Sequence, residues 1–240
     1  MAETFWQGSA ELGRLRWLTL VALNVAKVNI YLSRWLLMSV AAKKSYHHGN
    51  LRAVLIQAGL ELIAEKGVRA LTLREIGARV GVSRMAAYRH FADKAKLLAA
   101  IREVGFEKFA AALNEGRAGS AAGFPARMSA MGAAYVRFAR EHPAYFEVMF
   151  SPPPSVEPPE ACDAEKRAFQ ILEETIVDGQ AKGDVRAGDT KLMACALWSI
   201  VHGISALKLD QMPFAQPLAQ DDFVIACSGL LFTGILAAKK

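Results

Sequence analysis

The sequence lacks the residue patterns that catalysis and metal binding usually require. Its 240 residues include three cysteines, Cys162, Cys195 and Cys227, which lie far apart and form no C-x-x-C pair or metal-ligand spacing. Paired carboxylates at a catalytic spacing and a nucleophile elbow are also missing. We therefore expect no enzyme, no metal centre and no cofactor, and we expect the thiols to be reduced and buried, as in a cytoplasmic protein.

Signals for β-strands and for disorder are scarce as well. Glycine (18) and proline (9) are modest in number, and hydrophobic residues make up 53% of the chain. This composition is typical of a globular protein rather than a disordered one. Apolar residues recur at helical spacing. The predicted fold class is therefore all-α.

Positive charge is concentrated in one short segment of the chain. Residues 43–92 contain nine Lys or Arg side chains and three acidic ones, so their net charge of +6 equals that of the whole chain. A basic excess confined to one segment is typical of a surface that binds nucleic acid.

Within this segment, residues 72–94 predict two short helices joined by a glycine turn. Thr72 can cap the first helix, and Glu75 three positions later completes a capping-box pattern. Gly81 can end that helix in the left-handed conformation, and Ser83 can cap the second. The layout is that of a helix-turn-helix within a three-helix N-terminal domain. In this motif the second of the two short helices enters the DNA major groove.

The run from His47 to Leu98 resembles the DNA-binding domain of TetR-type transcriptional regulators. The matching motifs are T-L-R-E-I-G, G-V-S, Y-R-H-F and D-K-x-x-L-L. The resemblance implies that Thr72, Tyr88, His90 and Lys94 contact DNA phosphates. One departure is Gly77, where an alanine is common. It should loosen the first short helix, because glycine costs about 1 kcal/mol relative to alanine.

Side chains early in the second helix are candidates for base contacts. Arg84 can read guanine, whereas Met85 and Ala87 can offer only an apolar contact to a thymine methyl group. The full set of predicted DNA-binding residues is Thr72, Ser83, Arg84, Met85, Ala87, Tyr88, His90 and Lys94.

The N-terminal segment 1–42 is strongly apolar between Trp17 and Val40. Each Leu, Ile or Val favours membrane insertion by about 0.3–0.6 kcal/mol, but Lys27 near the centre costs about 2.5–3.5 kcal/mol. A membrane anchor is therefore not expected, and no small-residue cleavage site indicates a signal peptide. We expect residues 1–37 to be an appended helix or the product of a mis-assigned start, with Met38 as the alternative first residue.

Helical patterns continue to the end of the chain, giving a division into residues 1–42, 43–97 and 98–240. The predicted helices cover about 93–115, 125–141, 144–150, 161–182, 190–209 and 221–238. The last two carry few charges, and a helix that is apolar nearly all round must be buried. We expect them to pair with the same helices of a second copy. Such a homodimer places two reading helices about 34–36 Å apart on double-stranded DNA with an inverted-repeat operator.

A second motif, W-x-x-x-H-G, lies at Trp198, His202 and Gly203 and resembles a signature of one TetR-type subgroup. The H-P-A-Y run at 142–145 fits the same subgroup. The resemblance implies a ligand pocket in the larger helical domain, and Gly203 permits the close approach of another helix. The alternative is that this aromatic stripe is plain core packing. The candidate lining residues are Phe138, Tyr145, Phe146, Met149, Phe169, Leu172, Ile176, Trp198 and His202.

Few charges are available in this region to pair with an anion, so the expected effector is a small, mostly apolar molecule. The resulting hypothesis is a ligand-responsive, dimeric transcriptional repressor in the cytoplasm. The alternative is a ligand-independent DNA-binding or architectural protein whose second domain only dimerises.

Overall fold

The computed structural model describes residues 50–119, 123–150, 161–213 and 220–235. Their regular structure consists of α-helices and two short 3-10 helices, which confirms the all-α prediction. The apolar N-terminal segment, its alternative start at Met38 and the membrane anchor considered for it lie outside these residues.

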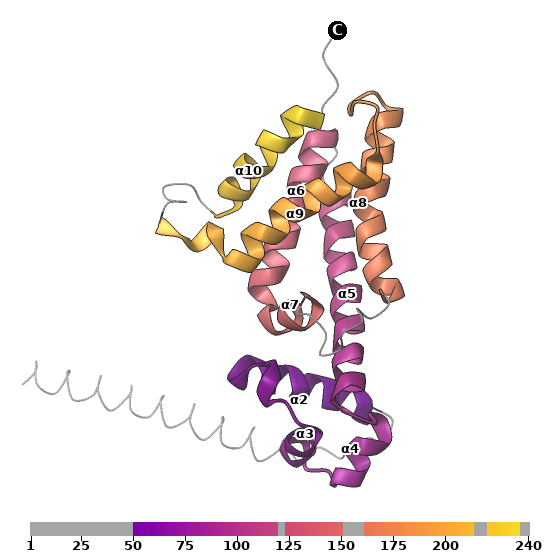
Figure 1. Ribbon diagram of the computed structural model, residues 1–240, viewed down its shortest axis with the longest axis vertical. Coiled ribbons are helices and arrows are strands. Elements are labelled where there is room, and N and C mark those ends of the chain that lie inside the picture. Colours follow the sequence, from indigo (N-terminus) through magenta and orange to yellow (C-terminus); the bar gives the residue numbers. More distant parts are fainter. Residues whose placement is uncertain (1–49, 120–122, 151–160, 214–219, 236–240) are drawn as a thin grey trace, which may run out of the picture. The chain divides into compact units, whose positions relative to one another are not determined.

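The N-terminal helices pack around one small apolar core (Figure 1). Leu55, Leu62 and Ile76 are fully or almost fully buried there, and Leu97 and Ile101 from the following helix complete the core. The elements are α2 (Leu51–Lys66), the 3-10 helix η1 (Val68–Ala70), α3 (Leu73–Val80) and α4 (Arg84–His90). The sequence predicted all of these helices except η1.

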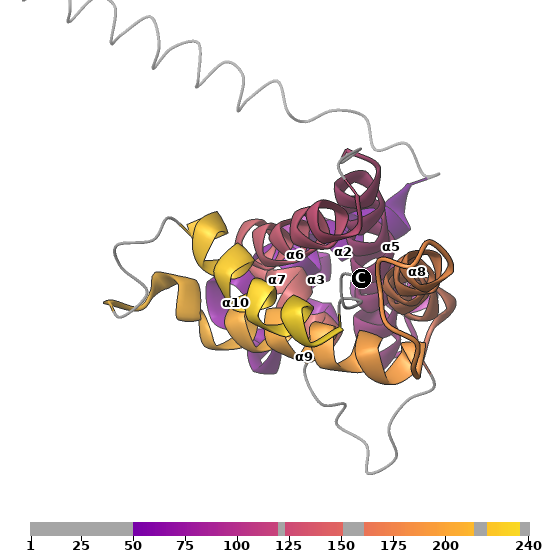
Figure 2. The same cartoon turned by 90° about the horizontal axis from the view of Figure 1, so that it is seen from above.

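The long helix α5 (Lys94–Ala118) continues from this core into a second one. Helices α6 and α8 pack along it, and α9 packs against both α6 and α8. Figure 2 shows α10 beside α9. The remaining elements are α6 (Phe124–Glu141), α7 (Pro143–Phe150), α8 (Asp163–Ala181), α9 (Thr190–Leu207), η2 (Leu209–Gln211) and α10 (Gln220–Ile235).

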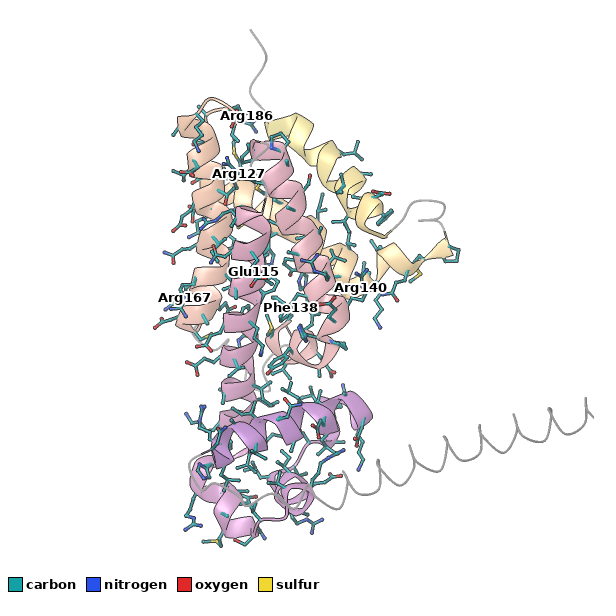
Figure 3. The ribbon with its side chains drawn as sticks, turned by 180° about the vertical axis from the view of Figure 1, so that it is seen from behind. Glu115, Arg127, Phe138, Arg140, Arg167 and Arg186 are labelled. Atoms are coloured by element: carbon teal, nitrogen blue, oxygen red, sulfur yellow. The ribbon has the colours of Figure 1, made fainter. Side chains whose placement is uncertain are left out.

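Aromatic rings dominate the second core. The Phe109 ring meets the rings of Tyr135, Phe138 and Trp198 edge to face, with centroids 4.8, 5.1 and 5.7 Å away. Such edge-to-face pairs add specific geometry to the burial of large apolar surfaces. In Figure 3, Phe138 lies among the helices while Arg167 lies on the outer side of α8.

Helix α9 is apolar but largely uncovered. It is the one helix among the described residues that is long and apolar enough, by length and composition, to cross a membrane, yet only 28% of it is buried. Leu192 is 68% exposed and Leu207 is 62% exposed, and both lie on the same side as the small residues Ala196, Ser199 and Gly203. The packing of one chain therefore leaves an apolar helix face uncovered.

Candidate DNA-binding interface and ligand pocket

Two side-chain caps and one glycine cap set the geometry of the helix-turn-helix. Thr72 Oγ1 accepts a hydrogen bond from Glu75 N at 3.2 Å, and Ser83 Oγ accepts one from Ala86 N at 3.2 Å. Gly81 has a φ of 77°, the left-handed conformation that lets the chain turn at the end of α3. These predicted caps are confirmed, and they fix the direction in which α4 leaves the turn.

The capping box is only half formed. Its second half would bring the Glu75 carboxylate back to the Thr72 backbone. Instead, Glu75 Oε1 accepts a hydrogen bond from Lys66 Nζ, which ties the start of α3 to the end of α2. A second tie joins the same helices, because Arg79 pairs with the Glu65 carboxylate. The guanidinium of Arg79 holds the pKa of Glu65 below its usual value through that hydrogen bond.

The outer surface of α4 carries a row of exposed side chains. Met85 is 72% exposed, and Tyr88 and His90 are also exposed. The Arg84 guanidinium lies 5.3 Å from the centre of the Tyr88 ring, one helical turn further along. This cation–π contact holds Arg84 against the helix while leaving its N–H groups available. Arg89 on the same helix is exposed as well, so the surface offers two cations, one flexible apolar side chain and two hydrogen-bonding rings.

The prediction that Ala87 faces outward is wrong. Ala87 is 0% exposed, because it lies on the side of α4 that packs on α3. Ala87 faces Gly77 across the helix contact, since a methyl group built on Gly77 would lie 3.6 Å from Ala87 Cβ. Ala87 cannot reach a thymine methyl group, and its role is to let α3 and α4 approach closely.

Lys94 is engaged within the protein. Its Nζ donates hydrogen bonds to the carbonyl oxygens of Val68, at 2.7 Å, and Arg69, at 3.1 Å. These contacts use two of the three ammonium donors and tie the start of α5 to η1. Lys94 is half-buried, whereas Thr72 and Ser83 are exposed. The sequence did not predict these two hydrogen bonds, because their acceptors lie in a 3-10 helix about 25 residues away that carries no strong sequence signal.

The predicted pocket residues are found together, but most of them form packed core. Eight of them belong to the aromatic core of α5–α9 or pack against it, and His202 contacts that core through Tyr135 and Phe150. Phe138, Met149 and Ile176 are 4%, 0% and 0% exposed. A cavity of about 30 Å³ does lie there, but of the predicted residues only Leu172 and Trp198 line it.

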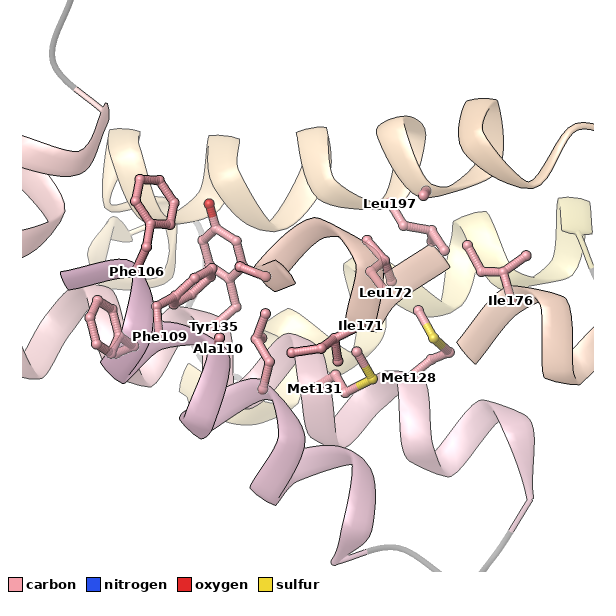
Figure 4. Packing of buried hydrophobic residues seen from close by; sticks show 14 of the residues in the cluster. Phe106, Phe109, Ala110, Met128, Met131, Tyr135, Ile171, Leu172, Ile176 and Leu197 are labelled. Atoms are coloured by element: carbon pink, nitrogen blue, oxygen red, sulfur yellow. The ribbon is translucent and has the colours of Figure 1, made fainter. Parts of the chain in front are cut away.

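The cavity lies between α5, α6, α8 and α9, and Figure 4 shows part of its surroundings. A cavity of about 10–15 Å³ on this measure holds one water molecule, so this cavity has room for two or three waters, and no drug-sized molecule fits without movement of the walls. Sequence reasoning missed seven of its nine residues. The complete lining is Leu113, Met128, Met131, Gly132, Tyr135, Leu172, Leu197, Trp198 and Val201.

Tyr135 and His202 form a polar pair beside this cavity. The Tyr135 hydroxyl is 2.8 Å from His202 Nδ1, and the imidazole packs against Phe146 and Phe150 at centroid distances of 5.6 and 4.7 Å. Burial lowers the pKa of His202 and raises that of Tyr135, because both lose hydration of their charged forms. Both side chains are therefore neutral at pH 7. The space beside Gly203 is open, since no described residue of this chain approaches within 4 Å of its built Cβ, and the prediction that another helix packs there stays a prediction.

Helix α7 touches both parts of the molecule. Phe146 and Phe150 face His202, while Glu147 Oε1 accepts a hydrogen bond from Val68 N at 3.4 Å. Arg102 holds the helix from the other side, because its guanidinium donates to Met149 O and to the Glu165 carboxylate, the latter at 2.8 Å. One short helix thus contacts the aromatic core and the 3-10 helix that Lys94 also holds.

Comparison with known proteins identifies both halves of this arrangement. Residues 55–101 match the family model described as bacterial regulatory proteins, tetR family, and residues 128–226 match that of the tetracyclin repressor-like C-terminal domain. A solved structure from Rhodococcus sp. RHA1, described as a protein with unknown function, is 30% identical with a TM-score of 0.69. The alignment covers 80% of this chain and 98% of that one. The chain belongs to the TetR family. It is thus a non-enzymatic transcriptional regulator that binds DNA through its helix-turn-helix.

More distant TetR-family structures share the fold. A regulatory protein in the tetR family from Rhodococcus RHA1 is 24% identical with a TM-score of 0.62, and the alignment covers 78% of this chain and 98% of that one. The ketosteroid transcriptional regulator KstR2 of Mycobacterium tuberculosis is 18% identical with a TM-score of 0.55, over 79% of this chain and 97% of that one. No curated protein matches this TetR-family chain.

Proposed function

We propose that this TetR-family regulator is a dimeric repressor that a small, mostly apolar molecule releases from an inverted-repeat operator. The observation that carries the proposal is the position of α7, which contacts both the aromatic core and η1. A ligand that enlarges the cavity must move side chains in contact with this helix. A ligand shifts such an equilibrium only by its difference in affinity for the two conformations.

The proposed DNA contacts follow the exposed side of the helix-turn-helix. Arg84 is suited to reading guanine and Met85 to a thymine methyl group, because both project from the first turn of α4. Phosphate contacts are assigned to Thr72, Ser83, Tyr88, His90 and Lys94. For Lys94 we propose that the one donor not used on η1 reaches the DNA backbone.

The uncovered face of α9 supports a homodimer formed by α9 and α10. Leu192 and Leu207 border a stripe of small residues on α9, and on α10 Ile225 is 43% exposed. Exposed apolar surface of this extent usually marks a contact with another protein. The open space beside Gly203 would let a second copy of α9 approach closely. The same contact explains the apolar character of α9 without a membrane, in keeping with a cytoplasmic regulator.

The division into residues 1–42, 43–97 and 98–240 remains a proposal, as does the W-x-x-x-H-G grouping. Helix α5 spans the 97/98 boundary, so the two helical domains share it. The shared helix supports transmission of movement between them, because a helix is stiff along its axis.

One observation favours the alternative, a ligand-independent DNA-binding protein. The cavity is about 30 Å³, far below the roughly 300–1,000 Å³ typical of ligand pockets. Under this alternative the aromatic core serves only to hold the dimer together.

Two measurements test the proposal. Selection of bound sequences from random DNA should yield an inverted repeat whose half-sites are about one helical turn apart. A compound library should then contain neutral apolar molecules that weaken the operator complex. A single unrepeated half-site would contradict the dimeric arrangement, and a library without any releasing compound would favour the ligand-independent alternative.

A further inference from the structure

The walls of the cavity are uncharged and mostly apolar. None of its nine lining residues has a charged side chain, and its polar side-chain groups are the Tyr135 hydroxyl and the Trp198 indole N–H. Moving an ionised carboxylate or phosphate into such a site without a partner costs several kcal/mol or more. The lining thus discriminates strongly against anions.

Tyr135 keeps one hydrogen-bonding function beyond its bond to His202. A hydroxyl has one donor and two acceptor lone pairs. If the hydroxyl donates to His202 Nδ1, its oxygen can still accept a bond from a ligand; if it accepts from Nδ1–H, its own proton is available to a ligand carbonyl. In the first tautomer Tyr135 bonds a ligand hydroxyl as the acceptor, and in the second it donates to a ligand hydroxyl or carbonyl oxygen.

Two walls of the cavity are formed by flexible methionine side chains. Met128 and Met131 lie on α6 one turn apart and line the same space as Leu172 of α8. Unbranched thioether side chains change rotamer more easily than branched ones and fill irregular gaps. Their withdrawal extends the cavity along α6 and leaves Tyr135 as its polar end.

We infer that the effector is an uncharged, slender molecule with one oxygen function, a hydroxyl or a carbonyl, which hydrogen-bonds to Tyr135 while its apolar part displaces Met128 and Met131. This inference rests on the proposed ligand-responsive function and deepens it by naming the chemical class of the ligand. It excludes carboxylates and phosphorylated compounds as effectors at this site.

The test measures binding to the full-length protein without DNA. The probes form two series, naphthalene with 2-naphthol and 2-naphthoate, and octane with 1-octanol, 2-octanone and octanoate. Binding is followed by calorimetry and by quenching of Trp198 fluorescence. Trp198→Phe identifies that signal, because the other three tryptophans of the chain lie within residues 1–49.

Neutral oxygenated probes should bind at least tenfold more tightly than their matched carboxylates. Tyr135→Phe should weaken them about three- to tenfold, the range of one neutral hydrogen bond, while leaving naphthalene and octane unaffected. Unchanged hydrocarbon binding shows that the variant retains its pocket. Tyr145→Phe is the matched control, since it removes the hydroxyl of another partly buried tyrosine that does not line the cavity.

Three results would overturn the inference: carboxylates that bind as tightly as alcohols, equal affinities in Tyr135→Phe and Tyr145→Phe, or no binding by any neutral oxygenated probe. Release of operator DNA is measured separately. Probes that bind as expected but leave the operator complex intact would contradict the proposed function and not the ligand class.

Discussion

Gly77 offers a sharp test of the helix packing, because its replacement by alanine stabilises the protein only if the contact between α3 and α4 has room for a methyl group. A methyl group built on Gly77 lies 3.6 Å from Ala87 Cβ, 3.6 Å from Val82 O and 3.9 Å from Ser83 O. All three are ordinary van der Waals distances. The contact between α3 and α4 thus has room for an alanine side chain, and Gly77→Ala should stabilise the protein.

The expected gain in the free energy of unfolding from Gly77→Ala has two parts. Alanine is about 1 kcal/mol better than glycine inside a helix, and a newly buried methyl group adds up to about 0.8 kcal/mol. The expected gain in the free energy of unfolding is therefore roughly 1–2 kcal/mol. For a protein of this size that raises Tm by about 2–8 °C. Affinity for operator DNA should stay within about twofold, because Gly77 is buried.

Gly116 provides the matched control. It also lies in a helix, α5, so its replacement by alanine brings the same gain in helix propensity. Its built methyl group, however, lies 2.9 Å from Ala130 O and 3.2 Å from Ala134 Cβ. The carbonyl belongs to the backbone of α6 and cannot rotate away, and overpacking costs about 1–3 kcal/mol. Gly116→Ala should be neutral or destabilising by up to about 2 kcal/mol.

Urea unfolding followed by far-ultraviolet circular dichroism measures both variants, at one fixed protein concentration because the proposed dimerisation would make stability concentration-dependent. Opposite signs for the two substitutions, or a gap of at least about 1 kcal/mol between them, would support the packing of both sites. If Gly77→Ala destabilised the protein, α3 and α4 would have to lie closer than described, and the reasoning would fail.

Four further substitutions test the DNA surface, the dimer contact and the polar pair. Arg84→Ala should cost about 1–3 kcal/mol on the operator and relax specificity at one base pair, which binding-site selection would reveal. Lys94→Met should lower both Tm and the affinity for all DNA sequences, because the hydrogen bonds from Lys94 to η1 are lost. An unchanged Tm would show that these hydrogen bonds do not stabilise the fold. Leu192→Glu should shift the dimer toward folded monomer in sedimentation experiments, with unchanged helix content. Burial lowers the pKa of His202, so the contribution of neutral His202 to the free energy of unfolding is fully present above the unfolded-state pKa of about 6.5 and is lost as the pH falls below it. The wild-type protein should therefore lose stability to urea between pH 7 and 5 more steeply than His202→Gln. Parallel curves for the two proteins would contradict this role of His202.

The local signals in the sequence were sufficient for the helix ends of the DNA-binding domain. Thr72, Gly81 and Ser83 act through neighbours within a few residues, so each cap is readable from spacing alone. The hydrogen bonds from Lys94 to η1 could not be predicted from the sequence, because the acceptor carbonyls lie about 25 residues away in a 3-10 helix. Ala87 was misassigned because the face that a seven-residue helix buries depends on how it packs on α3, and spacing within the helix does not show that.

The ligand pocket was the least predictable part, for a different physical reason. Helical spacing identifies residues that point inward, and nearly all the predicted residues do so. Whether an inward side chain fills space or borders a void depends on rotamers and on the distances between four helices. Leu113, Met128 and Met131 border the void, while Phe138 and Ile176 fill the core beside it. These two groups share the same composition and periodicity, so the sequence alone cannot separate them.

The small volume of the cavity bears on the proposed regulation. A pocket equally open in both conformations would give a ligand equal affinity for the two, and such a ligand could not shift their populations. A cavity of about 30 Å³ instead requires its walls to move. The Tyr135 hydroxyl is bonded to His202, and His202 packs on Phe146 and Phe150 of α7. Under the proposed function, a ligand that enters beside Tyr135 disturbs α7, which also contacts η1, and this disturbance would give the ligand different affinities for the DNA-bound and released conformations.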